Sequence, residues 1–137
     1  LLLVTAAPVA ARGEVFVVRM TGAEEVPGPG DRDGRGLAVL TIDPRNGRVC
    51  FAIAVRNILQ PATVAHIHPG QVGVANPPII DLVAPGPRGL SAGCTEASSQ
   101  TLNNILNQPW AYYVNVHNQD YPAGAVRGQL ASLMMNP

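Results

Sequence analysis

The sequence contains three histidines, and the spacing of two of them suits metal binding. His66 and His68 are two residues apart in a stretch with the pattern of a strand, so both side chains point to one face, with Cα atoms roughly 6.6 Å apart. His117 ends another predicted strand. If these strands are neighbours, the three imidazoles can bind one ion, and neutral imidazole suits Cu, Zn, Ni and Fe. We therefore predict one Cu or Zn ion bound by these three histidines.

Three nitrogen ligands leave a coordination position open. Water can fill this position, or a carboxylate such as Glu25 or Asp120 can act as fourth ligand or orient a ring. Glu24 and Glu25 also fit a simpler interpretation as solvated loop residues. The competing interpretation of the histidines is structural, with rings hydrogen-bonded to carbonyls or carboxylates at strand ends. The sequence leaves both alternatives open.

Other chemistries have weak support. The sequence has no serine in a nucleophile-elbow pattern and no glycine-rich phosphate loop, so catalytic residues are not predicted. The formal net charge is zero, which argues against nucleic-acid binding because that binding depends on clustered positive charge. No membrane span is predicted, and a protein partner and the oligomeric state stay undetermined. An enzyme, such as one with dismutase-like activity at a single copper, is the less favoured class.

The first eleven residues are apolar and uncharged, with small residues at positions suited to cleavage before Arg12. This pattern is typical of the end of a secretory signal peptide. The alternative is an ordinary apolar tail or strand. We expect residues 1–11 to be a signal remnant, residues 12–133 to form the domain and residues 134–137 to be a tail. The protein is then secreted or periplasmic.

The two cysteines fit an oxidising compartment. Cys50 and Cys94 can form a disulfide, which would connect a hairpin strand to the segment before the only predicted helix. The alternative is a pair of buried thiols. Two cysteines are too few for a disulfide scaffold or a four-cysteine zinc site.

Glycine and proline together contribute 27 residues, which favours short strands joined by turns. One helix is predicted over 98–107, and Pro85, Gly86, Pro87 and Gly89 predict a loop before Cys94. In the strand over 48–56, large residues alternate with small ones, so we expect both faces to be covered. The predicted strands span 14–21, 36–43, 48–56, 62–68, 78–83, 110–117 and 125–133. Seven or eight strands with one helix predict an all-β antiparallel Greek-key sandwich.

Four motifs of the chain are Gly22-Ala-Glu-Glu-Val-Pro27, Ala65-His-Ile-His-Pro-Gly70, Tyr113-Val-Asn-Val-His-Asn118 and Tyr121-Pro-Ala-Gly-Ala-Val-Arg-Gly-Gln-Leu130. In this order they resemble the motifs of the CHRD domain, which was named for its repeats in chordin and also occurs alone in exported bacterial proteins. The likeness spans about residues 14–132. Ala125 departs from the glutamate that many members carry before the Arg-Gly-Gln string, which removes one carboxylate partner for Arg127.

The resemblance implies an all-β domain in which Asn115, Arg127 and Gln129 belong to the structural family motif. In chordin-like proteins the domain sits in a secreted antagonist of growth factors, which implies a non-catalytic adhesion or protein-interaction module as the alternative function. The His-x-His strand also looks like the copper-binding strand of Cu/Zn superoxide dismutase, itself a Greek-key sandwich. This is an analogy at the level of the fold. Three histidines cannot supply the dinuclear dismutase site.

Overall fold

The computed structural model describes residues 13–132, and these residues form eight antiparallel strands, one α-helix and two short 3-10 segments. The 3-10 segments are Gly22–Glu24 and Pro109–Ala111, and the α-helix is α1 (Ser99–Asn107). The strands are β1 (Glu14–Thr21), β2 (Arg35–Asp43), β3 (Arg48–Arg56), β4 (Val64–Pro69), β5 (Ile80–Leu82), β6 (Leu90–Glu96), β7 (Tyr112–His117) and β8 (Val126–Gln129).

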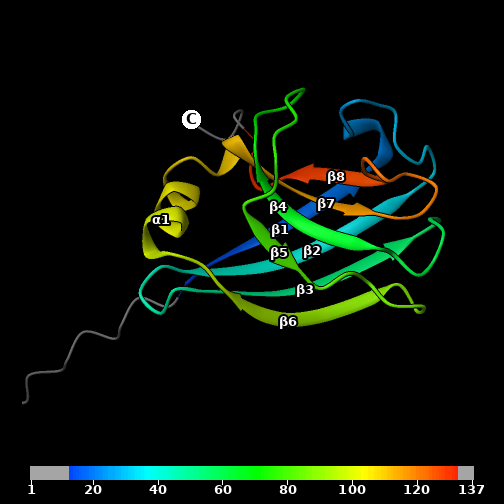
Figure 1. Ribbon diagram of the computed structural model, residues 1–137. Coiled ribbons are helices and arrows are strands. Elements are labelled where there is room, and N and C mark those ends of the chain that lie inside the picture. Colours follow the sequence, from blue (N-terminus) through cyan, green and yellow to red (C-terminus); the bar gives the residue numbers. More distant parts are fainter. Residues whose placement is uncertain (1–12, 133–137) are drawn as a thin grey trace, which may run out of the picture.

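The strands follow the order β5-β4-β7-β8-β1-β2-β3-β6 in one sheet (Figure 1). The sheet curls so that the edge strands β5 and β6 come into contact, which gives a nearly closed, barrel-like sandwich. One half contains β1, β2, β3 and β6, and the other half contains β5, β4, β7 and β8. The predicted all-β sandwich with one short helix is therefore confirmed.

The core lies between the two halves and is built by alternation along the strands. Strand β3 shows the pattern, because Val49, Phe51, Ile53 and Val55 are buried while the residues between them are more exposed. From the other half, strands β4 and β7 bury Ala65, Ile67, Val114 and Val116. Because the histidines alternate with these residues, they point to the opposite face of the sheet, away from this core.

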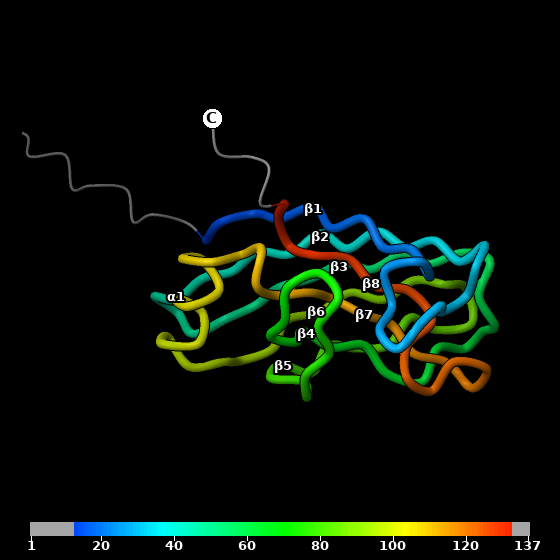
Figure 2. The backbone as a smooth tube through the Cα atoms, turned by 90° about the horizontal axis from the view of Figure 1, so that it is seen from above, coloured from blue at the N-terminus to red at the C-terminus, as the bar shows by residue number. Residues whose placement is uncertain are grey.

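Helix α1 closes one end of the sandwich, as Figure 2 shows at the left. Ser98 caps the helix by accepting a hydrogen bond from the backbone N–H of Thr101 at 3.1 Å. Leu102 and Ile105 lie on its buried side. The helix prediction for 98–107 is confirmed.

The outer face of β3 corrects the expectation that both faces are covered. Ala52 and Ala54 are exposed, and Val39, Leu37 and Leu90 on the neighbouring strands are exposed beside them. Small side chains on this face therefore do not mark a second packed layer.

Strand β6 was not among the predicted strands, because the loop of Pro85, Gly86, Pro87 and Gly89 was expected to lead to Cys94. Its sequence, Leu-Ser-Ala-Gly-Cys-Thr-Glu, has few β-branched or aromatic residues, so local preference does not indicate a strand. Pairing with β3 along seven residues imposes the extended conformation. The predicted strand over 110–117 also begins later, at Tyr112, because Pro109–Ala111 forms a 3-10 turn.

The predicted disulfide is confirmed between Cys50 of β3 and Cys94 of β6, which are directly opposed in the sheet. It connects the second hairpin strand to the strand that leads into α1. The sequence expectations for residues 1–11 and 134–137 lie outside the described residues. Within 13–132, no helix has both the length and the apolar character needed to cross a membrane.

Replacing both cysteines by serine is expected to lower the free energy of unfolding by about 3 kcal/mol, because the bond closes a long loop and restricts the unfolded chain. The two residues are 44 positions apart. Urea unfolding with and without reductant measures the loss, and the Cys50→Ser/Cys94→Ser variant is the control that must not respond to reductant. Two reactive thiols in the unfolded, unreduced wild type would contradict the bond.

Candidate metal centre

The strand register places the polar side chains of the candidate site in two adjacent rows across β5, β4, β7 and β8. The first row contains Asp81, His66, Asn115 and Arg127, which are paired in that order. The second row contains His68, Tyr113 and Gln129, again as direct cross-strand partners. His117 lies opposite Val64 at the next position along β7 on the same face. Antiparallel pairing therefore collects residues that are distant in the sequence.

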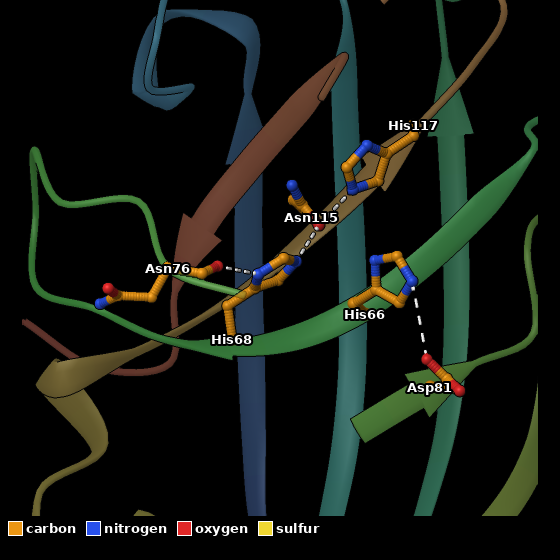
Figure 3. A network of polar contacts seen from close by, with 6 residues as sticks. All are labelled: His66, His68, Asn76, Asp81, Asn115 and His117. Atoms are coloured by element: carbon orange, nitrogen blue, oxygen red, sulfur yellow. Dashed lines mark hydrogen bonds and ion pairs between the residues drawn. The ribbon is translucent and has the colours of Figure 1, made fainter. Parts of the chain in front are cut away.

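The three histidine rings face one another on this surface (Figure 3). One nitrogen from each of His66, His68 and His117 lies within 4.8 Å of the others. The ring centroid of His66 is 5.3 Å from that of His68 and 5.2 Å from that of His117. The structure thus brings the three predicted ligands together, and their nitrogens could hold a metal ion.

Backbone carbonyls fix the orientation of two rings. Nδ1 of His68 is 2.7 Å from the carbonyl oxygen of Asn76, and Nδ1 of His117 is 2.9 Å from the carbonyl oxygen of Pro122. A carbonyl only accepts, so Nδ1 carries the hydrogen in both rings and donates it. In the neutral ring, Nε2 then has a free lone pair. Each Nε2 is directed toward Asn115, as Figure 3 shows.

His66 has a carboxylate, not a carbonyl, near one of its nitrogens, and that nitrogen is Nε2. Its Nε2 is 3.6 Å from Oδ1 of Asp81, whose side chain is 90% exposed. Its Nδ1 is buried and has no hydrogen-bond partner. A neutral ring with its hydrogen on Nε2, the side of Asp81, presents the Nδ1 lone pair to the other two rings. Metal-binding histidines characteristically hold their second nitrogen on a carboxylate or a carbonyl. His68 and His117 each have a carbonyl in this position, while the Asp81 carboxylate lies near His66 but beyond hydrogen-bond distance.

Burial favours the neutral, metal-binding form of two of the rings, those of His66 and His117. It lowers the pKa of His66, and the neighbouring His117 and His68 lower it further, while Asp81 opposes this effect. Burial is also the main cause that lowers the pKa of His117. Both rings therefore stay unprotonated below the pH at which an exposed histidine titrates.

The His68 ring belongs to a stack in which Tyr113 lies between His68 and Arg127. The His68 ring lies on the Tyr113 ring with centroids 4.7 Å apart and planes 7° apart. The guanidinium of Arg127 lies 3.4 Å from the centroid of the Tyr113 ring. Alternation along β7 puts Tyr113 on the same face as His117, and the pairing of β4 with β7 brings Tyr113 against His68.

Arg127 also holds the segment between β4 and β5, which carries the carbonyl that orients His68. Its guanidinium donates to the carbonyl oxygens of Val74 at 2.8 Å and Gln71 at 2.9 Å, and to Oε1 of Gln129 at 3.0 Å. Nε2 of Gln129 in turn donates to the carbonyl oxygen of Gly70 at 2.9 Å. These bonds explain why a charged side chain is 1% exposed.

Glu25 is buried behind the site, which overturns its interpretation as a solvated loop residue, whereas Glu24 is exposed. Burial raises the pKa of Glu25 to about 7, while Arg127 and a hydrogen bond from the Asn115 side chain lower it. The β1–β2 connection packs against β8 and carries Glu25 inward. The structure therefore places Glu25 behind Asn115 and outside the group of ring nitrogens.

Glu25→Gln is expected to remove a pH-dependent destabilisation from the metal-free protein. The folded-state pKa of about 7 lies above the ordinary 4.5, so the folded state holds this proton more tightly, and the stability it contributes is lost as pH rises from 4.5 through 7. The difference corresponds to about 3 kcal/mol. Urea unfolding at pH 4.5, 6 and 8 measures it, with Glu24→Gln as the exposed control. Identical pH profiles for wild type and Glu25→Gln would contradict the assignment.

The remaining predicted ligand, Asp120, lies on an exposed turn, and its carboxylate is not in the group of potential ligands found among residues 13–132. Sequence reasoning missed two contributors. Asp81 lies in the short strand β5, and only its pairing with His66 reveals it. Asn76 acts through its backbone carbonyl, for which a sequence contains no side-chain signal.

The fold and the cluster together define an all-β domain with three convergent histidines on one sheet face. Comparison with known families matches residues 16–130 to the CHRD domain. Because this match covers most of the chain, the protein belongs to the CHRD domain family, as the sequence motifs indicated. Neither the curated proteins nor the solved structures gave a significant match.

Proposed function

We propose that this protein is an exported CHRD-domain protein that binds one transition-metal ion, Zn(II) or Cu(II), through Nδ1 of His66 and Nε2 of His68 and His117. The observation that carries the proposal is the convergence of one nitrogen from each ring within 4.8 Å of the others. Carbonyl oxygens hold Nδ1 of His68 and Nδ1 of His117, and Nδ1 of His66 has no partner, so three lone pairs of neutral rings are directed at one another. Metal–nitrogen bonds of about 2.0–2.1 Å would draw the most widely separated nitrogens closer together.

The alternative, an interaction module with structural histidines, accounts for the carbonyl contacts of His68 and His117. It does not account for Nδ1 of His66, a buried acceptor with no partner that is directed into the cluster. Leaving such an atom unpaired costs about 1–3 kcal/mol. Metal coordination gives it a partner, so the cluster favours binding. Export is supported by the disulfide, which persists in oxidising compartments.

Isothermal titration of the chelator-treated protein with Zn(II) and with Cu(II) tests the proposal. We expect one ion per chain at pH 8, and an affinity that falls as pH drops below the lowered pKa values of His66 and His117, because protons then compete for the rings. A functional site should have a dissociation constant of about micromolar or lower. A dissociation constant of about millimolar or higher for both metals would favour the interaction module.

A further inference from the structure

We infer that the side-chain oxygen of Asn115 is a fourth ligand of this centre, which makes it a site with three nitrogens and one oxygen. The inference rests on the proposed metal binding and adds the donor that determines which ions the site prefers. It concerns a residue that the sequence assigned only to the structural motif of the family.

The position of Asn115 is the first observation. Its Oδ1 lies 2.9 Å from Nε2 of His68 and 2.9 Å from Nε2 of His117 (Figure 3). Ligand atoms bound to one ion at about 2.0–2.2 Å are separated by roughly 2.9 Å at right angles and 3.4 Å at tetrahedral angles. The oxygen therefore already stands at a ligand-to-ligand distance from two of the three ring nitrogens.

The second observation is that none of the three atoms in this contact, Oδ1 of Asn115 and Nε2 of His68 and His117, carries a hydrogen when the rings are neutral. His68 and His117 already donate through Nδ1 to carbonyl oxygens, so their Nε2 atoms have no hydrogen when the rings are neutral. A carboxamide oxygen cannot donate. Three lone pairs thus face one another in a place where Asn115 is 2% exposed. A cation at this point satisfies all three at once.

The contact made by the amide nitrogen of Asn115 supports the orientation in which Oδ1 is directed at the rings. The Asn115 side chain donates a hydrogen bond to the Glu25 carboxylate, and only its amide nitrogen can be the donor. Rotating the carboxamide by 180° would turn Oδ1 toward that carboxylate. Glu25 therefore holds the amide nitrogen, while the oxygen is directed at the rings.

The added oxygen defines the class of ion. A neutral carboxamide oxygen is a harder donor than imidazole or thiolate, so the set suits borderline divalent ions such as Zn(II), Co(II) and Ni(II) and disfavours Cu(I). His66 is the most exposed of the three rings, with 16% of its side chain accessible. A remaining coordination position on its side would be open to water or a small anionic ligand.

The experiment combines NMR with a matched pair of variants of the full chain at pH 8. Asparagine is labelled with ¹³C and ¹⁵N, and Zn(II) is added to the metal-free protein. We expect the ¹³Cγ resonance of Asn115 to move downfield at one equivalent while its Nδ2 resonance is retained. Asn103 on the exposed side of α1 is the internal control and should not move. Asn115→Leu should bind Zn(II) about tenfold or more weakly, whereas Asn103→Leu should bind as wild type does.

The outcomes separate the two proposals. If wild type binds no Zn(II), the proposed function fails and the inference fails with it. A second outcome is that Zn(II) binds to wild type, but the Asn115 ¹³Cγ resonance does not move and Asn115→Leu keeps full affinity. In that case the three-histidine site stands and Asn115 is not a ligand. Thermal unfolding of metal-free Asn115→Leu detects a folding defect, and in that case the ¹³Cγ result on wild type alone decides.

Discussion

Alanine in place of His66, His68 or His117, one at a time, is expected to weaken Zn(II) binding by more than about a hundredfold. Losing a partner of a ligand typically costs about 10–100-fold in affinity, and loss of the ligand itself exceeds this. The three rings supply all the nitrogen ligands of the cluster, so no remaining histidine can substitute. Titration calorimetry of the three variants and wild type measures the effect.

Asp81→Ala is the matched control for these variants. Asp81 contacts Nε2 of His66 at 3.6 Å, but its side chain is 90% exposed, so water can replace it. We expect a loss of no more than about tenfold in Zn(II) affinity. If any of the three alanine variants binds Zn(II) as tightly as Asp81→Ala does, that histidine is not a ligand.

Arg127→Met is expected to lower the free energy of unfolding by about 5 kcal/mol, because it removes a buried cation together with its bonds. The carbonyl oxygens of Val74 and Gln71 lose their donor, and Tyr113 loses the guanidinium above its ring. The segment that orients His68 through the Asn76 carbonyl is released with them. Zn(II) affinity should therefore fall as well, by roughly tenfold.

Urea unfolding and Zn(II) titration check both effects. Arg19→Met is the control, because Arg19 is an exposed arginine on β1 and its loss should change stability by no more than about 0.5 kcal/mol. Arg127→Lys keeps the charge but not the planar fork, so we expect it to recover only part of the loss. Full stability in Arg127→Met would show that the segment between β4 and β5 is held by other contacts.

The sequence predicted those parts of the fold that local pattern determines. Alternation of large and small residues identified β3, and the helix predicted over 98–107 corresponds to α1. Strand β6 was missed because its extended form depends on pairing with β3, a contact between residues far apart in the sequence. The prediction that both faces of β3 are covered was wrong for a related reason. Small residues such as Ala52 do not by themselves reveal whether another layer of the structure covers them.

The candidate site, like the fold, has features that the sequence could predict and features that it could not. The two-residue spacing of His66 and His68 fixes their common face, and strand parity places His117 on the face of Asn115, so the cluster could be anticipated once the strands were assumed to pair. The burial of Glu25 could not be anticipated, because it depends on how the β1–β2 connection folds over the sheet. The carbonyl that orients His68 belongs to the backbone, which side-chain patterns do not report.

The most direct test of the central claim is ¹⁵N NMR of the three imidazole rings during addition of Zn(II) to the metal-free protein at pH 8. The carbonyl partners of His68 and His117 and the unpartnered Nδ1 of His66 predict that the metal binds Nδ1 of His66 but Nε2 of His68 and His117. These three nitrogens should therefore shift together and saturate at one ion per chain. Ring resonances that stay unchanged after one equivalent of Zn(II) would contradict the metal centre.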